Sequence, residues 1–335
     1  MTLKKDKNMS YAVQVTTMQV RLILTIILFS TLTGFSQKKD TVYGSLDGQT
    51  LEIKNLQKKV FESKKEADRF EANKTFLKLW EEALRNPASI DHSFDSIKGV
   101  SCLTSHDKKF RIITWNVFKN DGQQAFFGFI QVNNRKVIKK GLFKKEVINE
   151  YEVFPLQDKS ATVTSPETFV GSPAKWFGML YYDIVDCDGY YTLLGWDGND
   201  NLIQKKFIDV LYFKSDGTPI FGKDVFRIPK KSPKRIMFQY SAEVAMSLKY
   251  NNKRGQIIFS HLSPKDEGST LEGQYQYYGP DGSFDAYEMK KDRWVLEEEI
   301  DIKNEKSKDD NLWNDPTNPT YKKRKKTMPA NSGKR

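Results

Sequence analysis

The chain is poor in the residues that build metal centres. It has two cysteines and three histidines among 335 residues. None of the histidines (His92, His106 and His261) has a second histidine two, three or four positions away, and no HExxH motif occurs. A zinc site or a metallohydrolase centre needs such clustering, so we predict no metal. A GxSxG elbow and a Walker loop are also missing, which excludes the common esterase and nucleotide-binding classes, and we predict no cofactor.

The two cysteines, Cys102 and Cys187, leave two interpretations open. An even number of cysteines fits a disulfide in an oxidising compartment. Two separate buried thiols fit as well, because cysteine is among the residues most often found in protein interiors. The sequence alone does not choose between them.

Net positive charge is small in the body of the chain, although the formal net charge of the whole chain is +11. Residues 1–36 carry +3 and residues 322–335 carry +7, so the segment between them carries only +1. The high isoelectric point therefore indicates no basic face on the fold. We predict no nucleic-acid partner.

A long hydrophobic run is also lacking, since residues 22–29 form a run shorter than the roughly 20 residues that span a membrane. A basic stretch precedes this run, and Gly34 and Ser36 place small residues at −3 and −1 of a cleavage site before Gln37. This pattern predicts a secretory signal peptide over residues 1–36.

Translation from Met1 and translation from Met18 both produce such a signal. An uncleaved membrane anchor is the alternative, and in either case the basic flank sends the rest of the chain across the membrane. We expect a periplasmic or secreted protein with no membrane span after cleavage.

The body, residues 37–302, is rich in strand patterns, and its centre is a hairpin. Residues 190–196 and 207–213 are aromatic, β-branched or Leu-rich runs that flank the turn 197–201, where Asp, Gly and Asn dominate. Tyr190 and Leu194 share one face, and Tyr191 and Leu193 share the other. Since both faces are apolar, we expect layers on both sides of this hairpin.

Further strands are predicted before and after it, joined by tight turns without intervening helices. We therefore predict a mainly β fold, an antiparallel meander in the form of a sandwich or open barrel. The Ser-, Thr- and Pro-rich stretch 157–173 is a long connection and a candidate boundary within the body. The other predicted strands cover residues 110–117, 125–132, 147–154, 175–185, 220–228, 235–240, 244–250, 256–262, 273–278, 283–289 and 294–300.

One amphipathic helix is predicted before the sheet, over residues 55–85, because apolar residues recur there every three or four positions. Residues 38–53 are expected to form a loop or a short strand. The polar tail, residues 303–335, ends in a basic run and is predicted to be disordered.

Several blocks of sequence resemble uncharacterised secreted proteins of Bacteroidota. The resemblance covers roughly residues 95–290, and the processing site at residues 34–37 is similar too. It agrees with export, and it implies no activity and no functional residues. The blocks are FRIITWNV, TLLGWDGNDN, KKFIDVLYF, GTPIFGKDVF, KRIMFQYSAEVAMSLKY and GPDGSFDAYE.

Aromatic residues crowd the central hairpin region and are the first candidates for a binding face. We select Trp176, Tyr182, Tyr190 and Trp196, because aromatic rings supply large contact areas for sugars and apolar groups. Core packing explains the same residues equally simply. Asp209 is a further candidate, since it interrupts an apolar strand and must be hydrogen-bonded or paired if it points inward.

Carboxylates provide the second class of candidates. Asp183, Asp209 and Glu243 could supply the pair that glycoside hydrolysis requires. The turn 197–201 superficially resembles a calcium loop, but an EF-hand would need Gly and Glu where this chain has Leu202 and Ile208.

These observations favour a non-catalytic binding or envelope-associated β module with a glycan or peptide ligand. Two alternatives stay open. One is a carboxylate-pair hydrolase acting on envelope glycans, and the other is a structural partner protein that uses the 55–85 helix.

Overall fold

The structure is a computed structural model that describes residues 44–302 except 135, 141–143, 149–150 and 267–270. The predicted signal peptide, its cleavage site at Ser36 and Gln37, and the polar tail 303–335 lie outside the described residues. None of the helices described is long and apolar enough to cross a membrane.

Two helices precede the sheets where one was predicted. They are α2 (Leu46–Glu62) and α3 (Glu66–Arg85), so the loop or short strand predicted over residues 38–53 is wrong from Leu46 onward, and residues 38–43 lie outside the described residues. The single helix predicted over 55–85 is wrong as well. Ser63 and Lys65 adopt extended backbone angles and break the helical run. Asp47 lies in the first turn of α2, where a carboxylate interacts favourably with the helix dipole.

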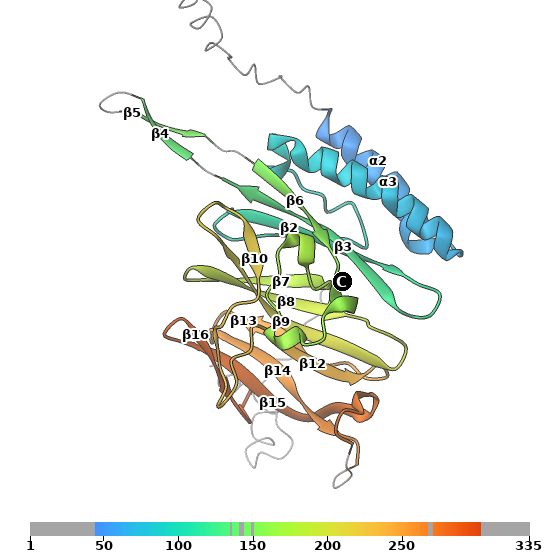
Figure 1. Cartoon of the computed structure of the whole chain (residues 1–335), viewed down its shortest axis with the longest axis vertical. Helices are drawn as coiled ribbons and strands as arrows, with labels where there is room; N and C mark the ends of the chain where they lie inside the picture. Colours follow the sequence, from blue (N-terminus) through green and yellow to red (C-terminus); the bar gives the residue numbers. More distant parts are fainter. Residues whose placement is uncertain (1–43, 135, 141–143, 149–150, 267–270, 303–335) are drawn as a thin grey trace, which may run out of the picture. The chain divides into compact units, whose positions relative to one another are not determined.

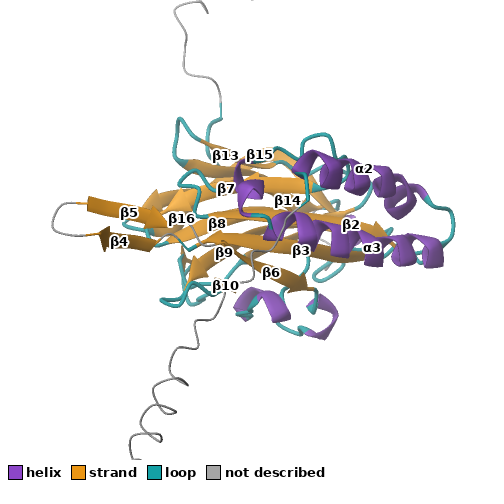
Figure 2. Ribbon diagram, turned by 90° about the horizontal axis from the view of Figure 1, so that it is seen from above, coloured by secondary structure: helices purple, strands orange, loops and turns teal. Residues whose placement is uncertain are grey.

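The first sheet lies under the two helices (Figures 1 and 2). Its strand order is β1-β2-β3-β6, and all its pairs are antiparallel. The β2–β3 hairpin confirms the prediction for this region, with Phe110 opposite Val132. The strands are β1 (Ser101–Thr104), β2 (Phe110–Phe118), β3 (Gln124–Asn133) and β6 (Tyr151–Gln157), and β4 (Lys136–Lys140) and β5 (Lys144–Ile148) form a separate two-stranded hairpin.

The central sheet has the order β10-β9-β8-β7, and β12 pairs with β9 beside β10. A single strand was predicted over residues 220–228, but Gly222 ends β10 with a φ of 88°. A Cβ atom there would lie 2.6 Å from the carbonyl oxygen of Phe169, so glycine is required. The strands are β7 (Leu180–Cys187), β8 (Tyr190–Asp197), β9 (Ile203–Phe213), β10 (Pro219–Phe221) and β12 (Ile236–Ser241).

The third sheet has the order β11-β16-β15-β14-β13, with one parallel pair between β11 and β16. Along the first part of β14, Ile257 and Phe259 are buried while Gln256 and Ile258 are partly exposed, and Ser260 is buried again next to Phe259. This alternation is typical of a sheet with one solvent face. The strands are β11 (Phe226–Arg227), β13 (Leu248–Asn251), β14 (Gln256–Pro264), β15 (Tyr278–Lys290) and β16 (Arg293–Glu297).

Three hydrophobic clusters join these layers. The first interface, between the first and central sheets, contains Tyr191 and Leu193. The second interface, between the central and third sheets, contains Tyr190 and Leu194. The prediction that the central hairpin is covered on both sides is therefore confirmed, and so is the fold class: a mainly β protein of open antiparallel sheets with helices before them.

The third cluster packs the helices onto the first sheet. Phe76 and Trp80 of α3 contact Trp115 of β2 through their rings. The apolar stripe of the helices is thus covered by the chain's own sheet. A partner-binding helix would need that stripe to be open.

Candidate functional site

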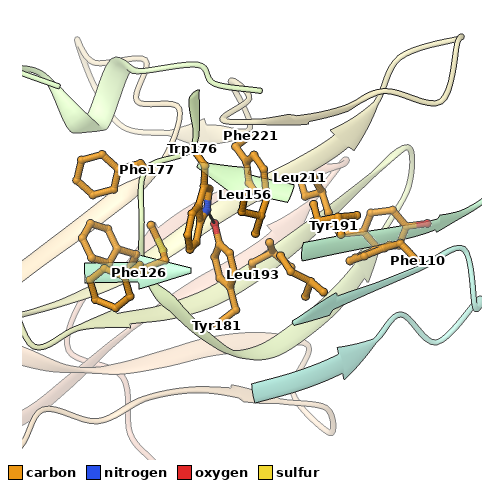
Figure 3. Packing of buried hydrophobic residues seen from close by; sticks show 14 of the residues in the cluster. Phe110, Phe126, Leu156, Trp176, Phe177, Tyr181, Tyr191, Leu193, Leu211 and Phe221 are labelled. Carbon is orange, nitrogen blue, oxygen red and sulfur yellow. Dashed lines mark hydrogen bonds between the residues drawn. The ribbon is translucent and has the colours of Figure 1, made fainter. Parts of the chain in front are cut away.

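The aromatic residues predicted to form a binding face are divided between two cores. Trp176 is fully buried in the first interface, where its indole N–H donates to the Tyr181 hydroxyl at 3.1 Å (Figure 3). Tyr190 is buried in the second interface, on the opposite face of the central sheet. The prediction of one exposed aromatic face that includes them is wrong, because both faces of this sheet are covered.

Tyr182 and Trp196 are half-buried and already have partners. The Tyr182 hydroxyl donates to the carbonyl oxygen of Leu248 at 3.0 Å, and burial raises the pKa of this hydroxyl. The Trp196 indole N–H donates to Gln204 at 3.2 Å. Core packing, the other explanation for these residues, accounts for what the structure shows.

Asp209 is fully buried, and the expectation that it must be paired is confirmed. Its carboxylate accepts hydrogen bonds from the Arg235 Nε at 3.0 Å and from the Tyr181 hydroxyl at 2.8 Å. Burial and the neighbouring negative charge of Asp209 raise the pKa of Tyr181 well above its ordinary value. A ligand cannot reach this carboxylate, so its role is structural.

The other carboxylates considered for hydrolysis are not brought together with Asp209. Asp183 lies on the side of the second interface, near Tyr250, whose pKa its charge helps to raise. Glu243 lies on the exposed connection between β12 and β13. Among these three, the structure forms no catalytic pair.

Cys102 and Cys187 are both free, so the disulfide interpretation is wrong. Cys102 packs against the helix-covered cluster and Cys187 against the second interface, with the first and central sheets between these clusters. Burial raises the pKa of the Cys102 thiol to about 11, which makes it a poor nucleophile.

A different set of residues lines a large cavity. It has a volume of about 790 Å³ and lies where the β2–β3 turn, the end of β6 and the β8–β9 turn meet. We call it the end hollow. Its floor is apolar and includes Phe126, Leu156 and Phe177, and its rim carries Asp158, Asp197, Asn199, Asp200 and Lys205.

Asp158 fastens the long connection after β6 to its neighbours. One carboxylate oxygen accepts the backbone amides of Ser160 at 2.9 Å and Gly178 at 3.1 Å, and the other accepts the amide of Phe126 at 3.4 Å. A Cβ atom on Gly178 would lie 2.3 Å from the Asp158 carboxyl carbon, so only glycine permits this approach. Both oxygens of Asp158 are engaged by the chain itself.

Both carboxylate oxygens of Asp200 also accept hydrogen bonds from the chain itself. Its Oδ1 accepts the amides of Leu202 and Ile203 at 2.8 and 2.9 Å, and its Oδ2 accepts the Asn199 side-chain amide at 2.7 Å. Lys205 donates to Asn199 Oδ1 at 2.6 Å. Asx hydrogen bonds therefore build this turn.

Asp197 differs from its neighbours. Its Oδ1 accepts the Asn199 amide at 2.7 Å, while its Oδ2 has no hydrogen-bond partner among the described residues. Burial is the main cause that raises the pKa of this carboxyl, and the charges of Asp158 and Asp200 add to the shift. The Asn199 amide and the positive charge of Lys205 oppose it. The hollow therefore holds one desolvated carboxylate oxygen that a ligand could engage.

The described part of the chain contains no group of three or more His, Cys, Asp or Glu side chains placed to hold a metal ion. Sequence analysis found the β8–β9 turn but did not connect it with Asp158 or Lys205. Two partners of Asp158, Phe126 and Gly178, are distant along the chain, so no local pattern could reveal its position.

No protein-family model matches this chain, and searches of curated proteins and of solved structures give no match. The functional argument therefore depends on the geometry described above.

Proposed function

We propose that this is an exported, non-catalytic binding module whose ligand occupies the end hollow. The observation that carries the proposal is the apolar floor combined with the desolvated Oδ2 of Asp197. Binding sites typically combine a mostly apolar concave surface with a few placed polar groups. A residue whose pKa is perturbed by burial in a cleft is also a common marker of function.

The chemistry of the hollow favours a peptide segment as the ligand. An apolar side chain would pack on the partly exposed Phe127 and Val163, because Phe126 and Phe177 are buried in the first interface. An amide N–H or an amine would donate to Asp197. Within the rim, the three carboxylates outnumber the lysines Lys119 and Lys205, so an anionic ligand would be repelled. A glycan is the other ligand class, and the test below separates the two.

Hydrolysis by a carboxylate pair is the alternative activity, and the raised pKa of Asp197 would suit a general acid. Such a mechanism needs a second carboxylate able to act as a nucleophile or base. Asp158 and Asp200 are the neighbouring candidates, and backbone or amide donors occupy both oxygens of each. This difference supports binding over catalysis.

Calorimetry with a pool of short peptides rich in Phe and Leu, and with neutral oligosaccharides, tests the proposal. We expect peptide binding that Asp197→Asn weakens, because the amide keeps the Asn199 contact but removes the negative acceptor. Asp216→Asn is a matched control, since Asp216 accepts the Thr218 amide at 2.9 Å in another Asp-Gly turn away from the hollow.

Peptide affinity should also rise as the pH increases and the Asp197 carboxyl ionises. The pKa of this carboxyl lies above its ordinary value of 3.8. Equal affinity of the two variants and the parent protein would contradict the proposed site. Binding of oligosaccharides alone, weakened by Asp197→Asn, would keep the site and change the ligand class.

A further inference from the structure

A second cavity, like the end hollow, is lined in part by the β8–β9 turn. It has a volume of about 760 Å³, and Asn201 and Leu202 of that turn contribute to its wall. The remaining walls come from residues 241–244 after β12, residues 263–265 at the end of β14, and residues 276–281 at the start of β15. We call it the tyrosine cleft, after Tyr277 and Tyr278.

Exposed apolar side chains are concentrated in this cleft. Seven large hydrophobic side chains are exposed among the described residues, and three of them line it: Leu202 at 65%, Tyr277 at 46% and Val244 at 39%. Single exposed apolar residues are ordinary on protein surfaces, but a group of them in one concavity indicates a contact surface.

Tyr277 is presented on a rigid backbone. Its amide donates to the Gln274 carbonyl at 3.0 Å, and its carbonyl accepts the Lys265 amide at 2.8 Å. The neighbouring rings of Tyr275 and Tyr278 contact each other, with centroids 5.6 Å apart. The Tyr277 side chain has no ring contact or hydrogen bond with any other described residue. The backbone is therefore held in place while the ring is open on the surface, free of competing partners and available to a ligand.

Polar groups also line this cleft. Asn201 contributes to its wall, but the Asn201 side-chain amide lies against Gly122 of the β2–β3 turn. The side chains of Gln276 and Glu243 line the cleft and form no hydrogen bond with other described residues. They offer planar amide and carboxylate groups that can pair with hydroxyls. Glu243 and Asp281 outweigh the single positive charge of Lys265, so a polyanionic ligand is disfavoured.

We propose that the tyrosine cleft is a separate binding site for a neutral glycan. Tyr277 would stack on the apolar C–H face of one sugar ring, and Glu243 and Gln276 would bond to its hydroxyls. This site depends neither on the ligand of the end hollow nor on Asp197. The two sites would let one module hold a glycan and a peptide, each against the β8–β9 turn.

Saturation-transfer NMR and calorimetry with cellohexaose, maltohexaose and chitohexaose test this site on the purified protein. We expect at least one of these oligosaccharides to bind, and Tyr277→Ala to weaken it about tenfold, the loss that corresponds to about 1.4 kcal/mol. Tyr277→Trp should preserve binding, because it keeps a flat aromatic surface.

Phe118→Ala is the matched control, since Phe118 is 50% exposed and lies outside the cleft. Its glycan affinity should equal that of the parent protein. The proposal is overturned if none of the three oligosaccharides binds, or if Tyr277→Ala binds as tightly as Phe118→Ala. Because Tyr277 does not line the end hollow, peptide binding by Tyr277→Ala distinguishes failure of this site from failure of the other.

Discussion

The two faces of the central sheet are filled in different ways. In the first interface, the Arg235 guanidinium pairs with Asp209 and also donates to the carbonyl oxygens of Pro166 and Phe169. In the second interface, the deeply buried indole N–H of Trp294 donates to the neutral Thr192 hydroxyl at 2.9 Å. The first interface thus contains a buried ion pair, whereas the second contains a neutral hydrogen bond within apolar packing.

The connection between β6 and β7 accounts for this difference. Its backbone runs through short 3₁₀ turns and not through a sheet, so carbonyl groups that approach the core need another donor. Arg235 supplies that donor, and Asp209 neutralises its charge. The second interface joins regular strands that satisfy one another's backbone groups, and its buried carboxylate Asp285, opposite Phe259, pairs with the half-exposed His261 and not with a buried cation.

Asp209→Ala should have the largest effect on stability, because it leaves the Arg235 guanidinium buried without its counter-charge. We expect the free energy of unfolding to fall by about 3–5 kcal/mol in chemical denaturation. The double variant Asp209→Leu with Arg235→Met should recover only part of this loss, because it removes both charges but leaves the carbonyl oxygens of Pro166 and Phe169 without their donor. If Asp209→Ala lowered the free energy of unfolding by less than about 1 kcal/mol, the buried ion pair would not be what stabilises the first interface.

Thr192→Val tests the second interface with a smaller change. Valine has nearly the same shape as threonine but cannot accept the hydrogen bond from Trp294, so a buried donor loses its partner. The expected loss is about 1–3 kcal/mol, measured by the same denaturation. If Thr192→Val lowered the free energy of unfolding as much as Asp209→Ala, the proposed contrast between an ion pair in one interface and a neutral hydrogen bond in the other would be wrong.

The smallest effects concern pH, at the margins of the two interfaces. The pKa of Asp197 is raised mainly by burial, so stability should decline as pH rises from 3.8 through the folded pKa. The pKa of His261 on the third sheet is raised mainly by its hydrogen bond to Asp285, at 2.8 Å. The stability from this pair is fully present below pH 6.5 and is lost as pH rises through the folded pKa.

Solvent screens the half-exposed His261 pair, so its contribution should stay below about 1 kcal/mol. Denaturation across a pH series checks both groups. Asp197→Asn should reduce the pH dependence of the free energy of unfolding in the acidic range only. His261→Asn should reduce it in the neutral range only. A variant that reduces it in the other range would contradict the assignment.

The sequence was sufficient to predict the arrangement of the central hairpin. Alternating apolar residues at Tyr190, Tyr191, Leu193 and Leu194 indicated two covered faces, and the structure has them. The same observation explains why the aromatic candidates were misplaced, because residues chosen for a ligand face belong to the two cores. Local composition cannot say which layers cover a strand.

Other features depended on contacts between distant segments. The helical pair was predicted as one helix, since the break at residues 63–65 carries no Gly or Pro. The end hollow requires Asp158 to meet Phe126 and Gly178, and the tyrosine cleft requires four separate segments. No periodic pattern along the sequence predicts these contacts between distant segments.

Strand β8 has β7 and β9 at its edges and a sheet on each face. Its amide protons can therefore exchange with solvent only when the layers separate, whereas the amides of the outer edge strands can exchange through local opening. Hydrogen exchange should place β8 in the last cooperative unit to open. The innermost strand would then report the global free energy of unfolding, and it is the turn leaving this strand that lines both proposed binding sites.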